Sequence, residues 1–249
     1  MARRLKVGDT VYVPRARLGL AVDGASAFWR TSVRVVTERS VEVDLPDGEM
    51  ARVASSAAHT NMGVVIVRIG DYETEASLLD PLKKSLLHYC RLLLADDDMV
   101  QAWDIRAPDE LRELWKKNHR VCSHLVVIGH GRNDAVRFGR DNWVDATAFA
   151  ELLQAPKVTR KVVISLACRT GYAAFAQSLS RQKPCDVVMA PFHAVHGAVA
   201  SQFCETLLAH HLLRGETVSI SFRHARASVP GAVLFRLWDH GKLTAGAGS

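Results

Sequence analysis

Two apolar segments of the sequence each end on a reactive side chain. VVIGHG ends on His130 and Gly131, and VVISLACRTG carries Cys168 just beyond its apolar run. A cysteine attacks a carbonyl carbon as its thiolate, and a histidine beside it can take the thiol proton and later protonate the leaving amine. The two segments therefore predict nucleophilic catalysis, with Cys168 as the nucleophile and His130 as the general base.

Gly131 is expected to contribute through its backbone. Because glycine has no Cβ, the chain can turn sharply there and direct an amide N–H at a nearby oxygen. Together with the N–H of Cys168, this group is predicted to form an oxyanion hole, in which one donor contributes roughly 2.7 to 4 kcal/mol. A helix expected to start after Thr170 would favour the thiolate through its dipole.

Residues 63–249 have the alternating pattern that would bring these two segments together. Expected strands cover 64–70, 99–105, 124–131, 161–168, 186–192 and 232–239, with a hairpin near 135–139 and helices at about 75–94, from 107, and at 145–154, 172–182, 196–213 and 216–228. Strands that are apolar on both faces and separated by helices indicate an α/β fold with a mostly parallel sheet and helices on both faces. In such sheets the reactive crevice lies beyond the carboxyl ends of the strands. His130 and Cys168 would then face each other if their strands are neighbours.

The first 60 residues have a different pattern. Short strands are expected at 6–14, 29–36, 40–45 and 49–53, separated by turn residues such as those of Pro46-Asp47-Gly48. We therefore expect a small all-β domain over residues 1–60, a linker within 54–63 and a second domain over residues 63–249. The opening VGDTVYVP resembles that of Tudor-like and KOW-like five-stranded barrels, which implies a small N-terminal β-barrel.

The second domain resembles the caspase-like cysteine peptidases, and more closely the CHAT family of that clan. The matching motifs are IGHG at 128–131 and ISLACRTG at 164–171, followed by a region at 187–226 and by the terminal LFRLWDHGKL. The resemblance covers about residues 63–242. It implies a caspase-like fold and a cysteine endopeptidase in which His130 is the base, Cys168 is the nucleophile, and no third catalytic residue is required.

The sequence departs from its relatives beside the nucleophile. Caspases resembling QACRG have a glutamine two positions before the cysteine and metacaspases have an acidic residue, whereas this chain has Leu166. The preference of those relatives for aspartate or for lysine and arginine is therefore not carried over. His130 and Cys168 are 38 positions apart, against about 50 in caspases, which implies a shorter connection and less substrate-binding loop.

The resemblance also implies a biological setting and partners. CHAT proteins commonly stand beside sensor or binding modules in prokaryotic defence and programmed-death systems. The expected partners are a protein substrate, such as a gasdermin-like pore former, and an activator or sensor protein bound by the N-terminal barrel. One alternative is a catalytically silent caspase-like scaffold that acts by binding through the barrel, since a fold does not by itself establish an activity.

Composition and charge limit the other classes of function. The chain has 249 residues, no apolar run near the roughly 20 residues of a membrane helix, and a start, MARRLKVGDTVYV, without the apolar segment of a signal peptide. We therefore expect a cytoplasmic protein with no membrane partner. The net charge of +6 is spread thinly, with 9 basic against 7 acidic residues in 1–62 and 23 against 19 in 63–249. Nucleic acid docked on the barrel is thus a weaker third interpretation.

No cofactor or metal is expected. The sequence has no phosphate loop and no complete dinucleotide fingerprint. Its five cysteines include no CxxC pair, which argues against a structural zinc site or a disulfide scaffold. His193 and His196 lie at a strand-to-helix junction, which is poor geometry for a shared metal ion. Packing is expected for the remaining cysteines, Cys90, Cys122, Cys185 and Cys204.

Overall fold

The computed structural model contains one large sheet built from the second part of the chain. It describes residues 5–21, 26–94 and 97–246, without the side chains of 72–74 and 97. The seven strands lie in the order β13-β12-β11-β10-β7-β5-β6. Their bounds are β5 (Val64–Ile69), β6 (Val100–Ile105), β7 (His124–Ile128), β10 (Lys161–Ser165), β11 (Cys185–Pro191), β12 (Phe235–Asp239) and β13 (Lys242–Ala245). Strands β6, β5, β7, β10 and β11 pair in parallel, and β12 and β13 add antiparallel, which confirms the predicted mostly parallel α/β sheet.

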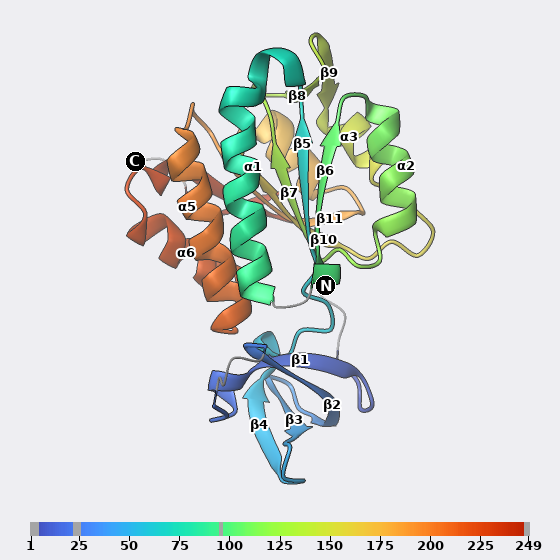
Figure 1. Cartoon of the computed structure of the whole chain (residues 1–249), viewed down its shortest axis with the longest axis vertical. Coiled ribbons are helices and arrows are strands. Elements are labelled where there is room, and N and C mark those ends of the chain that lie inside the picture. The colour runs from blue at the N-terminus through green and yellow to red at the C-terminus, as the bar shows by residue number, and fades with distance from the viewer. Residues whose placement is uncertain (1–4, 22–25, 95–96, 247–249) are drawn as a thin grey trace.

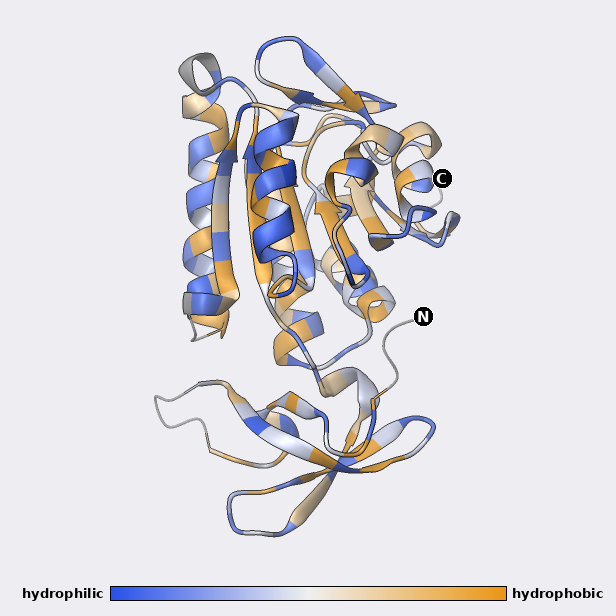
Figure 2. Ribbon diagram, turned by 90° about the vertical axis from the view of Figure 1, so that its right-hand side faces the viewer, coloured by the Kyte–Doolittle hydropathy of each residue, from blue (hydrophilic) through white to orange (hydrophobic). Residues whose placement is uncertain are grey.

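Helices cover both faces of this sheet (Figure 1). One face is covered by α1 (Tyr72–Leu94), α5 (Gly197–Leu208) and α6 (Val218–Ser228), and the other by α2 (Pro108–Asn118) and α3 (Ala146–Leu152). Because successive strand residues point to opposite faces, Val64 and Ile66 of β5 join the first core and Val65 and Val67 join the second. Figure 2 shows the resulting apolar strands between helices that turn hydrophilic residues outward.

Local sequence signals determine where several helices begin. Asp145 caps α3 by accepting a hydrogen bond from the N–H of Ala148 (2.9 Å), and Thr217 caps α6 by accepting one from Ile220 (3.4 Å). Pro108 occupies the first position of α2, where its missing N–H costs no helical hydrogen bond. Within the described ranges, no helix has the length and apolar character needed to cross a membrane.

Two helices that the sequence predicts as continuous are divided. The expected helix at 172–182 consists of a π-helical segment, η4 (Ala173–Gln177), followed by one turn, α4 (Ser178–Ser180). The expected helix at 196–213 consists of α5 and a π-helical segment, η5 (Ala209–Leu213). In η5 the N–H of Arg214 bonds to the carbonyl of Ala209 (3.0 Å), so one extra residue widens the last turn.

The ends of some strands also differ from expectation. β7 and β10 stop three residues before the predicted ends at 131 and 168, because the chain leaves the sheet in two loops. β12 starts at Phe235 because Ala232–Leu234 forms a 3-10 turn, η6, and β13 follows as a strand that the sequence pattern did not predict. The predicted hairpin is present as β8 (Ala135–Phe138) and β9 (Asn142–Asp145).

The N-terminal part is an antiparallel sheet with its own apolar cluster. It contains β1 (Thr10–Pro14), β2 (Phe28–Val36), β3 (Ser40–Asp44) and β4 (Met50–Ala54) in sequential order. After a 3-10 turn, η2 (Ser55–Ala57), the chain returns to β1, where Tyr12 and His59 exchange two backbone hydrogen bonds of 2.8 and 2.9 Å. Among the described residues this pairing is an isolated β-bridge, whereas the resemblance to five-stranded barrels implies a fifth strand.

The N-terminal sheet lies against the edge of the large sheet where β7 begins (Figure 1). Ser56 donates a hydrogen bond to the carbonyl of Gly215 (2.9 Å), and Arg17 donates one to the carbonyl of Arg214 (2.8 Å). Phe28 of β2 packs into the core formed by α1, α5 and α6. The opposite edge, where the parallel strands end, is therefore left to the two loops that carry His130 and Cys168.

Candidate active site

His130 and Cys168 follow neighbouring parallel strands. β7 and β10 pair with Val127 opposite Ser165, and each candidate residue lies three positions beyond its member of that pair. The N–H of Leu166 extends the pairing with a hydrogen bond to the carbonyl of Val127 (2.8 Å). The two loops therefore leave the sheet side by side at its carboxyl edge, which is the arrangement that the chemistry needs.

The two loops approach each other most closely at Gly131. A Cβ at this position would lie 2.6 Å from the carbonyl oxygen of Cys168 and 2.6 Å from Cγ2 of Thr170. The φ of Gly131 is not in the left-handed region, so the expected sharp turn is not the reason for glycine here. Glycine is needed because the backbone of one loop lies directly against the other.

Buried hydrogen bonds hold the loop that carries Cys168. Thr170 is fully buried, and its Oγ1 donates to the carbonyl of Ala167 (2.7 Å) and lies 2.8 Å from Oγ of Ser165. Between them, Arg169 has a φ of 64°, a left-handed conformation that is uncommon outside glycine. Such conformations cost about 1–3 kcal/mol and persist where their surroundings enforce them, often at functional sites.

The sulfur of Cys168 faces the segment that follows β11. The N–H of Val195 donates to Sγ (3.5 Å), and Sγ lies 3.9 Å from the carbonyl oxygen of the same residue. The backbone N–H groups of Cys168 and Gly131 donate no hydrogen bond to the part of the chain that the structure describes. Their oxyanion role stays a prediction.

Glu75 contacts the candidate base His130, although no sequence signal pointed to it. It lies in the first turn of α1 with a side chain that is only 8% exposed, and its Oε1 is 3.1 Å from Nε2 of His130. Oε1 also pairs with the guanidinium of Arg137, and Oε2 accepts the N–H of Asp71 (3.0 Å). An acidic residue in a first helical turn is too common to stand out in a sequence.

The contact with Glu75 determines which nitrogen of His130 can act as a base. A carboxylate only accepts hydrogen bonds, so Nε2 of the neutral ring carries the hydrogen and Nδ1 carries the lone pair. Among the described residues, Nδ1 has no hydrogen-bond partner, and no hydrogen bond joins the ring to Sγ of Cys168. Val195 contacts Sγ of Cys168 from the β11 side of the β10–β7 pair, and Glu75 contacts the ring of His130 from the β5 side.

Replacing Glu75 with glutamine is expected to lower kcat by about 10- to 100-fold with little change in KM. Glutamine keeps the size of the side chain, but it no longer stabilises the imidazolium that forms when His130 takes a proton. The measurement is steady-state cleavage of a fluorogenic peptide library. Glu113→Gln, on the exposed face of α2, is the matched control, and partial recovery in Glu75→Asp is expected. An unchanged kcat in Glu75→Gln would contradict a positioning role.

The other cysteines and histidines highlighted in the sequence have structural roles. The thiols at 90, 122, 185 and 204 are at most 1% exposed, as the sequence analysis expected. Burial raises the thiol pKa of Cys90 and Cys122 to about 12. His196 caps α5 by accepting the N–H of Ala198 at Nδ1 (3.2 Å), and the exposed His193 lies against the ring of Phe192.

The sequence matches no known family model and no curated protein. Among solved structures it is similar to a secreted C11 cysteine protease from Bacteroides thetaiotaomicron in complex with an irreversible peptide inhibitor, with a TM-score of 0.51 and 11% identity over 72% of this chain and 66% of that one. A second structure of a secreted C11 protease from that organism, iotapain, gives a TM-score of 0.50 and 9% identity over 72% and 67%. The chain thus spans about two thirds of the length of these proteases. At these identities the likeness shows a caspase-like fold, and the finer CHAT resemblance stays a prediction.

Proposed function

We propose that the protein is a cysteine endopeptidase that cleaves a protein substrate, with Cys168 as nucleophile and His130 as general base. The observation that carries this proposal is the pairing of Val127 with Ser165, which brings both loops to one edge of the sheet. The fold shared with C11 cysteine proteases supports the same class of enzyme.

The reaction begins with rotation of the Cys168 side chain away from Val195 and toward His130. Nδ1 of His130 takes the thiol proton, and Sγ forms a bond to the carbonyl carbon of the scissile peptide. Glu75 stabilises the imidazolium, while the N–H groups of Gly131 and Cys168 bind the negative oxygen of the tetrahedral intermediate. The intermediate collapses when His130 returns the proton to the leaving amine, and water then hydrolyses the thioester with the same base.

The biological part of the proposal is a role in prokaryotic defence or programmed death, with the N-terminal sheet binding an activator or sensor protein. It rests on the CHAT resemblance of residues 63–242. The alternative function is a catalytically silent scaffold, and the chemical state of the Cys168 thiol separates the two.

Iodoacetamide is expected to alkylate Cys168 at neutral pH at least 100-fold faster than any other cysteine. Cys168 is partly exposed. Burial raises the thiol pKa of Cys90 and Cys122 to about 12, so these two thiols stay protonated and unreactive at neutral pH. The measurement is peptide mass mapping after timed quenching, with denatured protein as the reference in which all five cysteines react.

The His130→Ala variant makes this test specific for an activated thiol. Loss of the base is expected to slow labelling of Cys168 by about tenfold or more, whereas His88→Ala on the exposed side of α1 is expected to leave the rate unchanged. Equal rates in the wild type and His130→Ala would favour the silent scaffold.

A further inference from the structure

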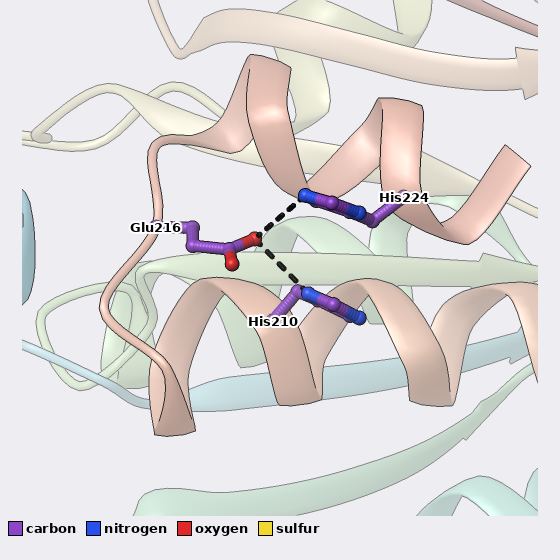
Figure 3. A group of neighbouring side chains, drawn as sticks. All are labelled: His210, Glu216 and His224. Atoms are coloured by element: carbon purple, nitrogen blue, oxygen red, sulfur yellow. Dashed lines mark hydrogen bonds and ion pairs between the residues drawn. The ribbon is translucent and has the colours of Figure 1, made fainter. Parts of the chain in front are cut away.

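Two histidines and a glutamate meet where η5 turns into α6 (Figure 3). His210 belongs to η5, Glu216 lies in the connecting turn, and His224 belongs to α6. The turn is also where the N-terminal sheet contacts the large domain, since Ser56 donates its hydrogen bond to Gly215. The cluster is therefore distant in topology from the carboxyl edge that carries Cys168.

Both imidazoles point at the same oxygen atom. Nδ1 of His210 lies 3.0 Å from Oε2 of Glu216, and Nε2 of His224 lies 3.8 Å from it. One nitrogen of each ring and one oxygen of the carboxylate lie within 4.8 Å of one another. The two rings are stacked almost parallel, with an interplanar angle of 7° and centroids 4.7 Å apart, so one ring must rotate before the in-plane lone pairs of both can meet at one ion.

The two separations from Oε2 are close to those between ligand atoms of a tetrahedral zinc site. Metal–ligand bonds of about 2.0–2.1 Å place tetrahedral ligand atoms about 3.4 Å from one another, a value between the two measured separations from Oε2. The ring of His224 is 53% exposed on one face of α6 and has room to rotate out of the stack with His210. His210 and Glu216, at 17% and 12% exposed, need not move.

The surroundings hold Glu216 in a ligating position. Its N–H donates to the carbonyl of His210 (3.1 Å), and its own carbonyl accepts Nδ1–H of His211 (2.7 Å). Nε of Arg214 lies 3.4 Å from Oε1, which leaves Oε2 directed at the two histidines. Hydrogen bonds of this kind orient ligating carboxylates in known metal sites.

We propose that His210, Glu216 and His224 bind one zinc ion, with a fourth coordination position open to water. Two imidazole nitrogens and one carboxylate oxygen suit zinc and exclude the all-oxygen coordination that calcium and magnesium prefer. The ion would join η5 to α6 at the segment on which the N-terminal sheet rests, and its role would be structural or regulatory. The proposal is independent of the proposed peptidase activity.

The test is zinc titration of the Cys168→Ala protein, in which the proposed catalytic thiol cannot compete for the metal. With a chromogenic chelator as competitor, we expect one equivalent to bind in the micromolar range or tighter. Replacing zinc with cobalt(II) should give the visible absorption of a four-coordinate ion. Bound zinc should also raise Tm, because a ligand that binds only the folded state stabilises it.

Variants assign the site to these residues. His224→Ala and Glu216→Gln are each expected to weaken zinc binding at least about tenfold, and His88→Ala is the matched control for a lost exposed histidine. Because His224 is largely exposed, its variant should keep the Tm of the metal-free protein. Failure of the Cys168→Ala protein to bind one equivalent saturably, or an unchanged affinity when His224→Ala is added to it, would overturn the assignment.

Discussion

Replacing Cys168 with alanine is expected to reduce cleavage of the physiological substrate by about 10⁴-fold or more, because no other group can form the thioester. The fold should survive, since the hydrogen bonds of Sγ to the described residues are one of 3.5 Å from the N–H of Val195 and a longer approach to the carbonyl of the same residue. His130→Ala is expected to have a comparable effect. The double variant should lose little more than either single one, because residues that act as a unit are not additive.

A proteome-wide comparison of new N-termini measures this loss and the cleavage preference together. Extracts treated with the wild type are compared with extracts treated with Cys168→Ala, and His88→Ala provides the control for a neutral substitution. Cleavage sites found with both the wild type and His88→Ala, and absent with Cys168→Ala, would define the residues flanking the cut bond. Undiminished proteolysis by Cys168→Ala would sink the peptidase proposal.

The second large effect is expected on stability in mild acid, and it comes from three histidines between the N-terminal sheet and the large domain. The ring of His211 lies 5.4 Å from that of His59 and 5.2 Å from that of His124, measured between centroids. Nε2 of His59 and of His124 is buried without a hydrogen-bond partner among the described residues. Burial lowers the pKa of His59 to about 3, places that of His124 well below its ordinary value and lowers that of His211.

The sign of the effect follows from these directions. An unfolded histidine has a pKa of about 6.5. Below that pH the unfolded chain therefore binds protons at these three histidines that the folded chain does not bind. The free energy of unfolding therefore has its full value above about pH 6.5 and falls as the pH decreases toward the pKa values of the folded state. Each histidine contributes up to about 1.4 kcal/mol per pH unit, or about 4 kcal/mol per unit for the three together.

Urea unfolding at pH 7.5 and pH 5.5 measures this dependence in a range where most carboxylates keep their charge. The free energy of unfolding is expected to drop by several kcal/mol between the two. His211→Gln, which removes one titrating ring from the centre of the cluster, should flatten the dependence, whereas His88→Gln should not. The same midpoint at both pH values in the wild type would show that the three rings do not resist protonation.

Much of the large sheet could be predicted because its signals are local. Continuous apolar runs such as that before Gly129 give buried parallel strands, and reactive residues just after two of them follow from the way parallel sheets are built. What could not be predicted depends on positions far apart in the chain. Glu75 reaches His130 only because α1 starts beside the end of β7, and no spacing in the sequence reports that position.

The histidine clusters illustrate the same limit. In the sequence, His193 and His196 suggest a metal pair, but their place at a strand-to-helix junction led us to expect no metal. The structure instead assigns His196 to a helix cap and brings His210 and His224 together through a turn whose π-helical start no periodicity reveals. The three buried rings at 59, 124 and 211 come from three separate segments, so only the folded chain places them together.

The N-terminal sheet docks at the start of β7, whereas Sγ of Cys168 lies beyond the other end of the parallel strands. His124 begins β7 beside that sheet and Ile128 ends it, so four steps of about 3.3 Å, roughly 13 Å of strand, separate the docked edge from the loop that carries His130. If the proposed function holds, a protein bound by the N-terminal sheet would present its cleaved bond at least about four extended residues away from the bound segment. The distance between the two ends of β7, as well as side-chain chemistry, would then select which bonds of the bound protein are cut.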